Sequence, residues 1–136
     1  MAEKFKAVLV TPKGVVLDKE VEEVVAPGIL GEFGVLIGHT PMLTFIKPGV
    51  FSYLENDKFT KFAVGAGFCE VLKDAVSILV DEAYTSEEID PKQAEAELAA
   101  LQQQLSQADS AADPQGFEQL TNKVKVAQAK VSLAGS

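Results

Sequence analysis

The sequence has no arginine and no tryptophan, and it has one histidine and one cysteine. Because every basic residue is a lysine, the chain lacks the guanidinium fork that makes bidentate contacts with phosphate and guanine. The twenty acidic residues outnumber the twelve lysines, and the net charge of −8 opposes the phosphate neutralisation on which nucleic-acid binding depends. We therefore expect no nucleic-acid partner.

The scarcity of reactive side chains restricts the chemistry. Cys69 is the only cysteine, so it forms no internal disulfide, and its apolar neighbours predict a buried structural thiol. His39 is the only histidine, which leaves no second imidazole for a metal cluster and favours a structural or interface role. The acid pairs at 22–23 and 81–82 are adjacent, and on a strand they would point to opposite faces. We expect no catalytic residue, no metal and no cofactor.

Long hydrophobic runs are also missing. No stretch approaches the ~20 apolar residues that cross a bilayer. The first residues, Met-Ala-Glu-Lys-Phe-Lys, lack the apolar core of a signal peptide. We therefore expect no direct insertion into a bilayer, and any membrane association would come through partners.

The first half of the chain, up to about Tyr84, alternates short β-branched or aromatic runs with turn residues. No long helical window interrupts it, which predicts an antiparallel β-sandwich or barrel. The expected strands are 5–11, 15–17, 21–26, 34–37, 42–46, 50–54, 58–64, 67–72 and 75–80. The expected turns are 12–14, 27–28, 48–49, 56–57 and 73–74.

The second half is rich in Ala, Gln, Glu, Leu and Lys, and it predicts two helices. Apolar residues recur there at steps of three and four, as on one face of a helix. Asp-Pro at 90–91 and at 113–114 supplies each helix with a capping carboxylate and a proline at its first position. The short polar segment 107–112 favours an antiparallel hairpin. The two stripes are Ala94, Leu98, Leu101 and Leu105, then Phe117, Leu120, Val124, Ala127 and Val131.

The most informative motif is GEFGVLIGHTP at 31–41, whose glycines and proline predict a tightly turned backbone with Glu32 and His39 at its two ends. Continued to residue 49, it resembles the signature of the epsilon subunit of F-type rotary ATP synthases, G-E-x-G-[IV]-x-x-G-H-x-P-[LM]-[LV]-T-x-[IL]-x-P-G. GAGFCEV at 65–71 and VSILVDEA at 76–83 are similar to two further family patterns, which extends the resemblance over most of residues 5–90.

The resemblance implies an α+β fold, with an N-terminal antiparallel β-sandwich of two five-stranded sheets followed by a C-terminal antiparallel two-helix hairpin. We expect the sandwich over 1–87 and the hairpin over 88–136. The resemblance also implies a non-catalytic rotor subunit of a proton-translocating ATP synthase. That subunit would lie peripherally on the cytoplasmic face of the bacterial inner membrane and couple the gamma subunit to the c-ring. Glu32 and His39 match the c-ring-facing positions of the family.

In family members the hairpin can extend along gamma into the alpha/beta catalytic head and block ATP hydrolysis. Lys123, Lys125 and Lys130 are the only basic residues of the last helix, and they are the candidates for contacts with acidic segments there. The alternative is that these lysines form a solvated face of the helix.

A third motif departs from the family pattern. Some bacterial members carry [IL]-D-x-x-R-A at the start of the hairpin, where the arginine helps to hold ATP. This chain keeps Ile89, Asp90 and Ala94 but has Gln93 in place of the arginine. We expect that the usual ATP clamp is not built, although Lys92 leaves a weaker alternative.

Two other interpretations stay open at the level of sequence. One is a free-standing enzyme or small-ligand-binding β-barrel, in which His39 and Glu32 line a pocket. The other is a passive adaptor whose hairpin never moves, which differs from the first only in regulation. Co-purification with an ATPase from membranes separates a stalk subunit from a barrel enzyme.

Overall fold

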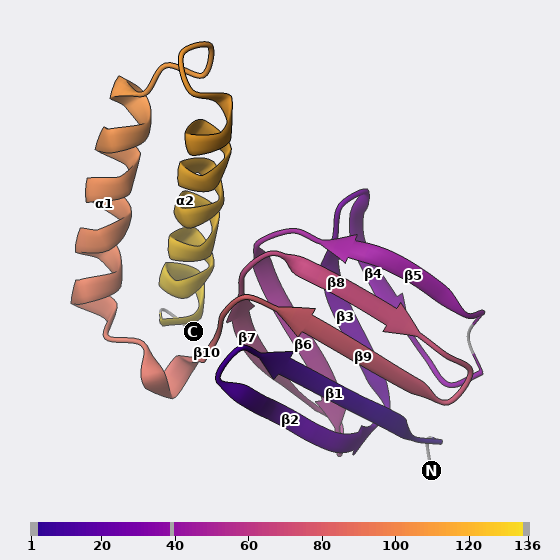
Figure 1. Ribbon diagram of the computed structural model, residues 1–136. Coiled ribbons are helices and arrows are strands. Elements are labelled where there is room, and N and C mark those ends of the chain that lie inside the picture. The colour runs from indigo at the N-terminus through magenta and orange to yellow at the C-terminus, as the bar shows by residue number, and fades with distance from the viewer. Residues whose placement is uncertain (1–2, 39, 135–136) are drawn as a thin grey trace.

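The computed structural model describes residues 3–38 and 40–134, so His39 lies outside the described residues (Figure 1). Strands fill the first part of the chain and helices the last, as the sequence predicts. The elements are β1 Phe5–Thr11, β2 Gly14–Val21, β3 Glu23–Gly28, β4 Gly31–Val35, β5 Met42–Ile46, β6 Gly49–Glu55, β7 Lys58–Val64, β8 Gly67–Val71, β9 Ala75–Val80, β10 Ala83–Thr85, a 3-10 helix Ser86–Glu88, α1 Pro91–Gln107 and α2 Pro114–Ala134.

The strands form two layers of five, which confirms the expected sandwich. One layer has the order β10-β7-β6-β3-β4 and the other the order β5-β8-β9-β1-β2. The layers join where Gly28 of β3 pairs with Ile46 of β5. One pair is parallel, since β1 runs beside β9 with Lys6 opposite Ala75. Parallel pairing needs a long connection between the two strands. The chain provides one, because seven other strands lie between β1 and β9 in the sequence.

The core lies between the layers and follows from the alternation of side chains along each strand. Phe5 and Leu9 point inward from β1 and are almost completely buried. Phe51 and Phe62 pack with their ring centroids 6.1 Å apart. Cys69 is buried in the same core, where burial raises the pKa of its thiol to about 12. The expectation of a buried structural thiol is therefore confirmed.

Several strand boundaries differ from the prediction. The expected strand 21–26 is broken at Glu22, whose backbone N–H donates to the Leu54 carbonyl at 2.8 Å. At this break the chain leaves the layer of β2 and enters the layer of β3. The turn expected at 27–28 is instead part of β3, and the chain turns at residues 29–30. The expected strand 34–37 begins earlier, as β4, so the first part of the signature segment is an extended strand and not a turn.

The glycine segment at 65–67 connects β7 to β8, and contacts on both sides explain its composition. A Cβ atom at Gly65 would clash with the Asp81 carboxylate, and one at Gly67 would clash with the backbone carbonyl of Leu79. These glycines allow close backbone approach between strands, which is a structural role.

Both helices begin at the predicted caps. Asp90 Oδ1 accepts the backbone N–H of Lys92 at 3.0 Å and that of Gln93 at 3.3 Å. Asp113 Oδ1 accepts the backbone N–H of Gly116 at 3.0 Å. These bonds satisfy amide groups that have no partner inside the first turn of a helix.

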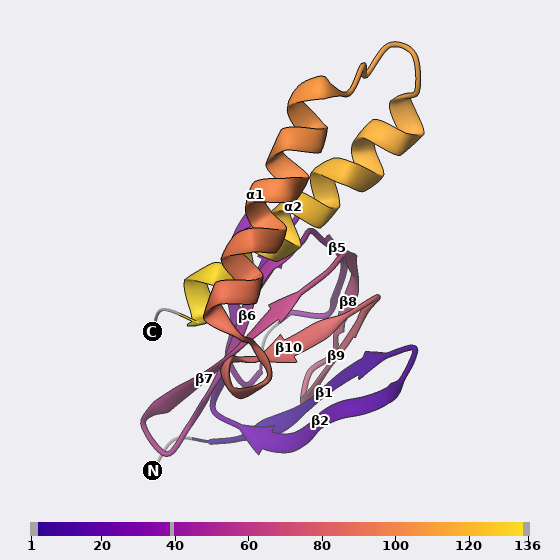
Figure 2. The same cartoon turned by 90° about the vertical axis from the view of Figure 1, so that its left-hand side faces the viewer.

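The hairpin docks on the sandwich through its lower end, while the connection between its helices projects away (Figures 1 and 2). A second, smaller apolar cluster forms there and links Ala63 of β7, Ala94 of α1, and Ala129 and Leu133 of α2. The helix α2 lies between α1 and the sandwich, which contacts it through β6 and β7. Its buried residues are Val124, Val126, Ala127, Ala129 and Leu133.

Candidate functional site

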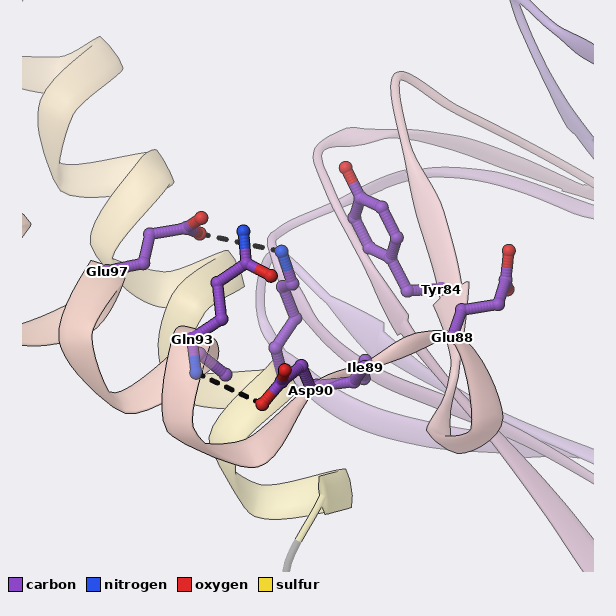
Figure 3. A pocket seen from close by; sticks show the side chains of 8 residues that line it. Tyr84, Glu88, Ile89, Asp90, Gln93 and Glu97 are labelled. Atoms are coloured by element: carbon purple, nitrogen blue, oxygen red, sulfur yellow. Dashed lines mark hydrogen bonds and ion pairs between the residues drawn. The ribbon is translucent and has the colours of Figure 1, made fainter.

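The residues that correspond to the family's ATP motif, Ile89, Asp90, Gln93 and Ala94, line a crevice where the hairpin meets the sandwich (Figure 3). Its volume is about 200 Å³, below the ~300 Å³ at the lower end of small-molecule pockets. The lining residues are Tyr84, Glu88, Ile89, Asp90, Gln93, Ala94, Glu97 and Lys130. All four motif residues thus lie together, beside one of the three lysines of the last helix.

Local hydrogen bonds fix the segment that leads into the hairpin. Glu88 Oε1 accepts the Thr85 backbone N–H at 2.8 Å and the Thr85 hydroxyl at 3.0 Å. These bonds lower the pKa of the Glu88 carboxyl, because they stabilise its charged form. Ile89 follows and is buried in the second cluster, and Asp90 caps α1. The motif therefore has a structural function in this chain, since it anchors and begins the hairpin.

Among the described residues, Lys130 is the one cation that lines this crevice. Its Nζ lies 4.4 Å from the centroid of the Tyr84 ring and 3.5 Å from Glu97 Oε1. The hydroxyl of Tyr84 donates to Glu82 Oε1 at 2.8 Å. Burial, followed by that bond to Glu82, raises the pKa of Tyr84 to about 12. Lys130 is thus held between a ring of the sandwich and a carboxylate of α1.

The three lysines of α2 have different environments. Lys123 and Lys125 are exposed, and Lys123 borders a second crevice beside Glu82. The side chain of Lys130 is only 17% exposed. No local pattern distinguishes the three lysines, because the partner of Lys130 on the sandwich, Tyr84, is distant in the chain.

The electrostatics of the crevice oppose an anionic ligand. Glu88, Asp90 and Glu97 line it against the single ammonium group of Lys130, and that group is already paired. Gln93 contributes a neutral amide beside them (Figure 3). A polyphosphate would meet an excess of negative charge here.

The acid pair at 81–82 does not have the expected geometry. Asp81 and Glu82 lie between β9 and β10, outside the regular strands, and both line the same crevice beside Gly65. The opposite-face argument was wrong because it assumed a strand. Burial, with a smaller contribution from the charge of Glu82, raises the pKa of Asp81. Glu82 itself accepts the Tyr84 hydroxyl, and both acids border the crevice between the sandwich and α2.

Glu32 is exposed near the start of β4 and borders a hollow shared with Lys61 of β7 and Ser132 of α2. The position of His39 follows the far end of β4. There the Gly38 N–H donates to the Lys73 carbonyl at 3.2 Å. In the part of the chain that is described, the structure does not bring Glu32 together with the residues that flank position 39.

Sequence reasoning missed an apolar row on the outer face of the β5-β8-β9-β1-β2 layer. The strand registers align its members across all five strands, and they are Phe45, Phe68, Leu79, Val10 and Val15. Phe45 is 66% exposed and Phe68 is 42% exposed. The signal in the sequence is the run Met-Leu-Thr-Phe-Ile at 42–46, which is apolar on both faces of a strand.

Residues 3–38 and 40–134 contain no group of three or more His, Cys, Asp or Glu side chains arranged to hold a metal ion. In the same ranges, neither helix combines the length and apolarity needed to span a membrane.

The fold and these surfaces define a binding protein made of a β-sandwich, with an exposed apolar sheet face, and a docked helical hairpin. The family model of the ATP synthase delta/epsilon chain β-sandwich domain matches residues 4–86. The chain belongs to the ATP synthase epsilon chain family, as its signature segments predicted.

Relatives cover from about three quarters of the chain to nearly all of it. The ATP synthase epsilon chain 2 of Syntrophotalea carbinolica is 39% identical over 99% of this chain and 96% of its own length. The epsilon chain of Geobacter metallireducens is 45% identical over 77% of this chain and 76% of its own length. A chain in the OSCP/F1/c-ring structure of Euglena gracilis mitochondrial ATP synthase has the same fold, with a TM-score of 0.81 at 22% identity. The match covers 100% of this chain and 84% of that one.

Proposed function

We propose that this chain is a non-catalytic rotor subunit of a proton-translocating ATP synthase, where it couples the gamma subunit to the c-ring. The observation that carries the proposal is the exposed apolar row, in a chain whose epsilon relatives match it over almost its full length. A soluble monomer rarely exposes a continuous apolar patch that has no partner. Rotation requires a subunit fixed to its neighbours, and this surface suits such a contact.

The gamma subunit is the partner that we assign to the apolar row. The row crosses all five strands of its layer, so a rigid sheet presents it. The hairpin docks against the other layer, through β6 and β7, and leaves this face open (Figure 1). Aromatic side chains such as Phe45 and Phe68 are the kind that anchor stable protein interfaces.

The c-ring is the partner that we assign to the end of the sandwich near Glu32. The adjacent turn between β3 and β4 carries Ile29 and the fully exposed Leu30. His39 lies outside the described residues, and its position in the sequence follows the far end of β4, so it enters the c-ring proposal through the family motif and not through a surface shared with Glu32. An exposed carboxylate beside these exposed apolar side chains is suited to contact with the polar loops of the c-ring.

The hairpin is the regulatory part in this proposal, and it inhibits ATP hydrolysis when it extends toward the alpha and beta subunits. Lys123 and Lys125 are already exposed for such contacts. Lys130 becomes available only after it leaves Tyr84 and Glu97. The subunit would be peripheral to the membrane, on the cytoplasmic face in a bacterium.

Two phenylalanines provide a matched test of the gamma contact. Phe68 lies in the apolar row and is 42% exposed, whereas Phe59 lies on the other layer and is 45% exposed. We expect Phe68→Glu to abolish co-purification with gamma, because it places a charge within the apolar row, between Phe45 and Leu79. Phe59→Glu should bind gamma as the unmodified chain does.

The measurement is size-exclusion chromatography of each variant with purified gamma, followed by reconstitution with an epsilon-depleted ATPase and assay of proton pumping. Equal binding by the two variants would reject the assignment of gamma to this face. Failure of the unmodified chain to bind gamma or restore coupling would reject the proposed function and leave a free-standing domain.

A further inference from the structure

We propose that Lys130 is a clasp that fastens the docked hairpin to the sandwich, by placing its ammonium group between the Tyr84 ring and the Glu97 carboxylate. The clasp concerns the docked state of the chain by itself. It holds whether or not the extended hairpin inhibits ATP hydrolysis.

The contacts of Lys130 join three elements at one point. Lys130 comes from α2, Glu97 from α1 and Tyr84 from β10. The ammonium group lies 4.4 Å from the ring centroid and 3.5 Å from the carboxylate oxygen. Glu97 ties the two helices together and holds the ammonium group over the ring, and the ring belongs to the sandwich.

The surroundings make the contact between Lys130 and the Tyr84 ring stronger than the same contact made by a lysine that is fully exposed to water. The Lys130 side chain is 17% exposed, so little water screens it. Tyr84 donates its hydroxyl proton to Glu82 at 2.8 Å. A hydrogen bond to a carboxylate makes the ring more electron-rich, which increases its attraction for a cation.

The apolar contact beside the clasp is small. Three of the five buried residues in the second cluster are the alanines Ala63, Ala94 and Ala129. Alanine side chains remove little apolar surface from water, so they stabilise docking weakly. The polar contact of Lys130 at the same joint therefore contributes a larger share of the docking free energy than it would beside a large apolar interface.

Removal of the ammonium group would also leave like charges across the joint. Glu82 on the sandwich and Glu97 on the hairpin line the same crevice as Lys130. The cation offsets their repulsion in the docked state. Lys123 also borders this crevice, but it is exposed and solvent screens its charge, so the loss of Lys130 removes most of the compensation and favours separation of the two carboxylates.

Single-molecule energy transfer on the isolated full-length chain tests the clasp. One dye is attached at Lys73→Cys on the sandwich and the other at Ser110→Cys in the connection between the helices. Both sites are exposed, whereas Cys69 is buried with its pKa raised to about 12 and stays unlabelled. The method counts docked and undocked molecules separately, without any synthase present.

We expect Lys130→Met to lower the ratio of docked to undocked molecules roughly tenfold. Lys125→Met removes the same charge from an exposed site on the same helix, and it should leave the ratio unchanged. Equal ratios for these two variants, with helix content confirmed by circular dichroism, would overturn the clasp.

Variants of Tyr84 and Glu97 separate the contributions of the ring and of the carboxylate to docking. Tyr84→Leu removes the ring and should undock the hairpin more than Tyr84→Phe, which removes only the hydroxyl bond to Glu82. Glu97→Gln changes an exposed side chain, and it decides the question if Lys130→Met does not fold. A docked fraction unchanged in both Tyr84→Leu and Glu97→Gln would rule out the proposal.

Discussion

At the scale of single residues, the fold gives Lys130 an aromatic ring and a carboxylate as partners, whereas Lys123 and Lys125 stay exposed. The burial of Cys69 and the capping by Asp90 follow from their immediate neighbours, and both were predicted. The contact of Lys130 with Tyr84 depends on how α2 meets β10, which no local pattern encodes. Three lysines with similar sequence contexts therefore acquire different environments.

Glu32 offers a prediction at this scale. It was expected in a turn but lies in β4, where it is exposed and borders the same hollow as Lys61. Charge reversal at an exposed site changes the free energy of unfolding by less than about 0.5 kcal/mol. We expect Glu32→Lys to fold normally and to weaken ATP-driven proton pumping, because it disturbs charge complementarity at the proposed c-ring contact.

The comparison uses membranes rebuilt with Glu32→Lys or with Glu95→Lys, a control that reverses an exposed charge on α1. Thermal unfolding checks the fold of both variants. Full pumping with a folded Glu32→Lys protein would contradict the c-ring contact at this position.

At the scale of elements, periodicity predicted which segments are helices and strands but not every surface that they bury. The stripe containing Val124 and Ala127 was found on α2. A second set, Val126, Ala129 and Leu133, recurs at steps of three and four and is also buried. A helix between two partners needs two apolar faces. The break at Glu22 escaped prediction because it depends on the strand switching layers.

The foot of the hairpin supports a prediction about ATP. The isolated chain should not bind ATP at micromolar concentrations, because the crevice presents three carboxylates and one paired ammonium group. Charge-assisted bonds are about twice as strong as neutral ones, so the Gln93 amide is a poor substitute for an arginine.

Titration calorimetry at millimolar Mg-ATP measures this directly. Gln93→Arg restores a cation and leaves the contact between Lys130 and Glu97 in place, and this variant should bind more tightly than the unmodified chain. Saturable binding by the unmodified chain at tens of micromolar would contradict the charge argument.

At the scale of the whole molecule, the sandwich and the hairpin share little apolar surface. The main core consists entirely of sandwich residues. Within the second cluster, the sandwich contributes the buried Ala63 and the partly buried Val50 and Tyr84. The sandwich and the hairpin therefore meet through a narrow joint. The division at residue 87 stays a prediction, and it rests on the change from strand to helix periodicity in the sequence.

This narrow joint leads to the last prediction, that a chain ending at Glu87 folds by itself. The truncation uncovers the outward side chains of Val50 and Ala63 but leaves the core between the layers complete. Exposure of about one valine side chain costs roughly 1.5–3 kcal/mol, which lowers the melting temperature but preserves a single cooperative transition.

A second chain, ending at Ala112, keeps α1 but lacks α2. In the full-length protein α2 lies between α1 and the sheet (Figure 1). We expect α1 to unfold in that chain, since an isolated helix of this length is marginal in water. Calorimetry should then give similar melting temperatures for the two truncated chains, and both should bind gamma. A molten or insoluble 1–87 chain would show that the hairpin is part of one folding unit with the sandwich.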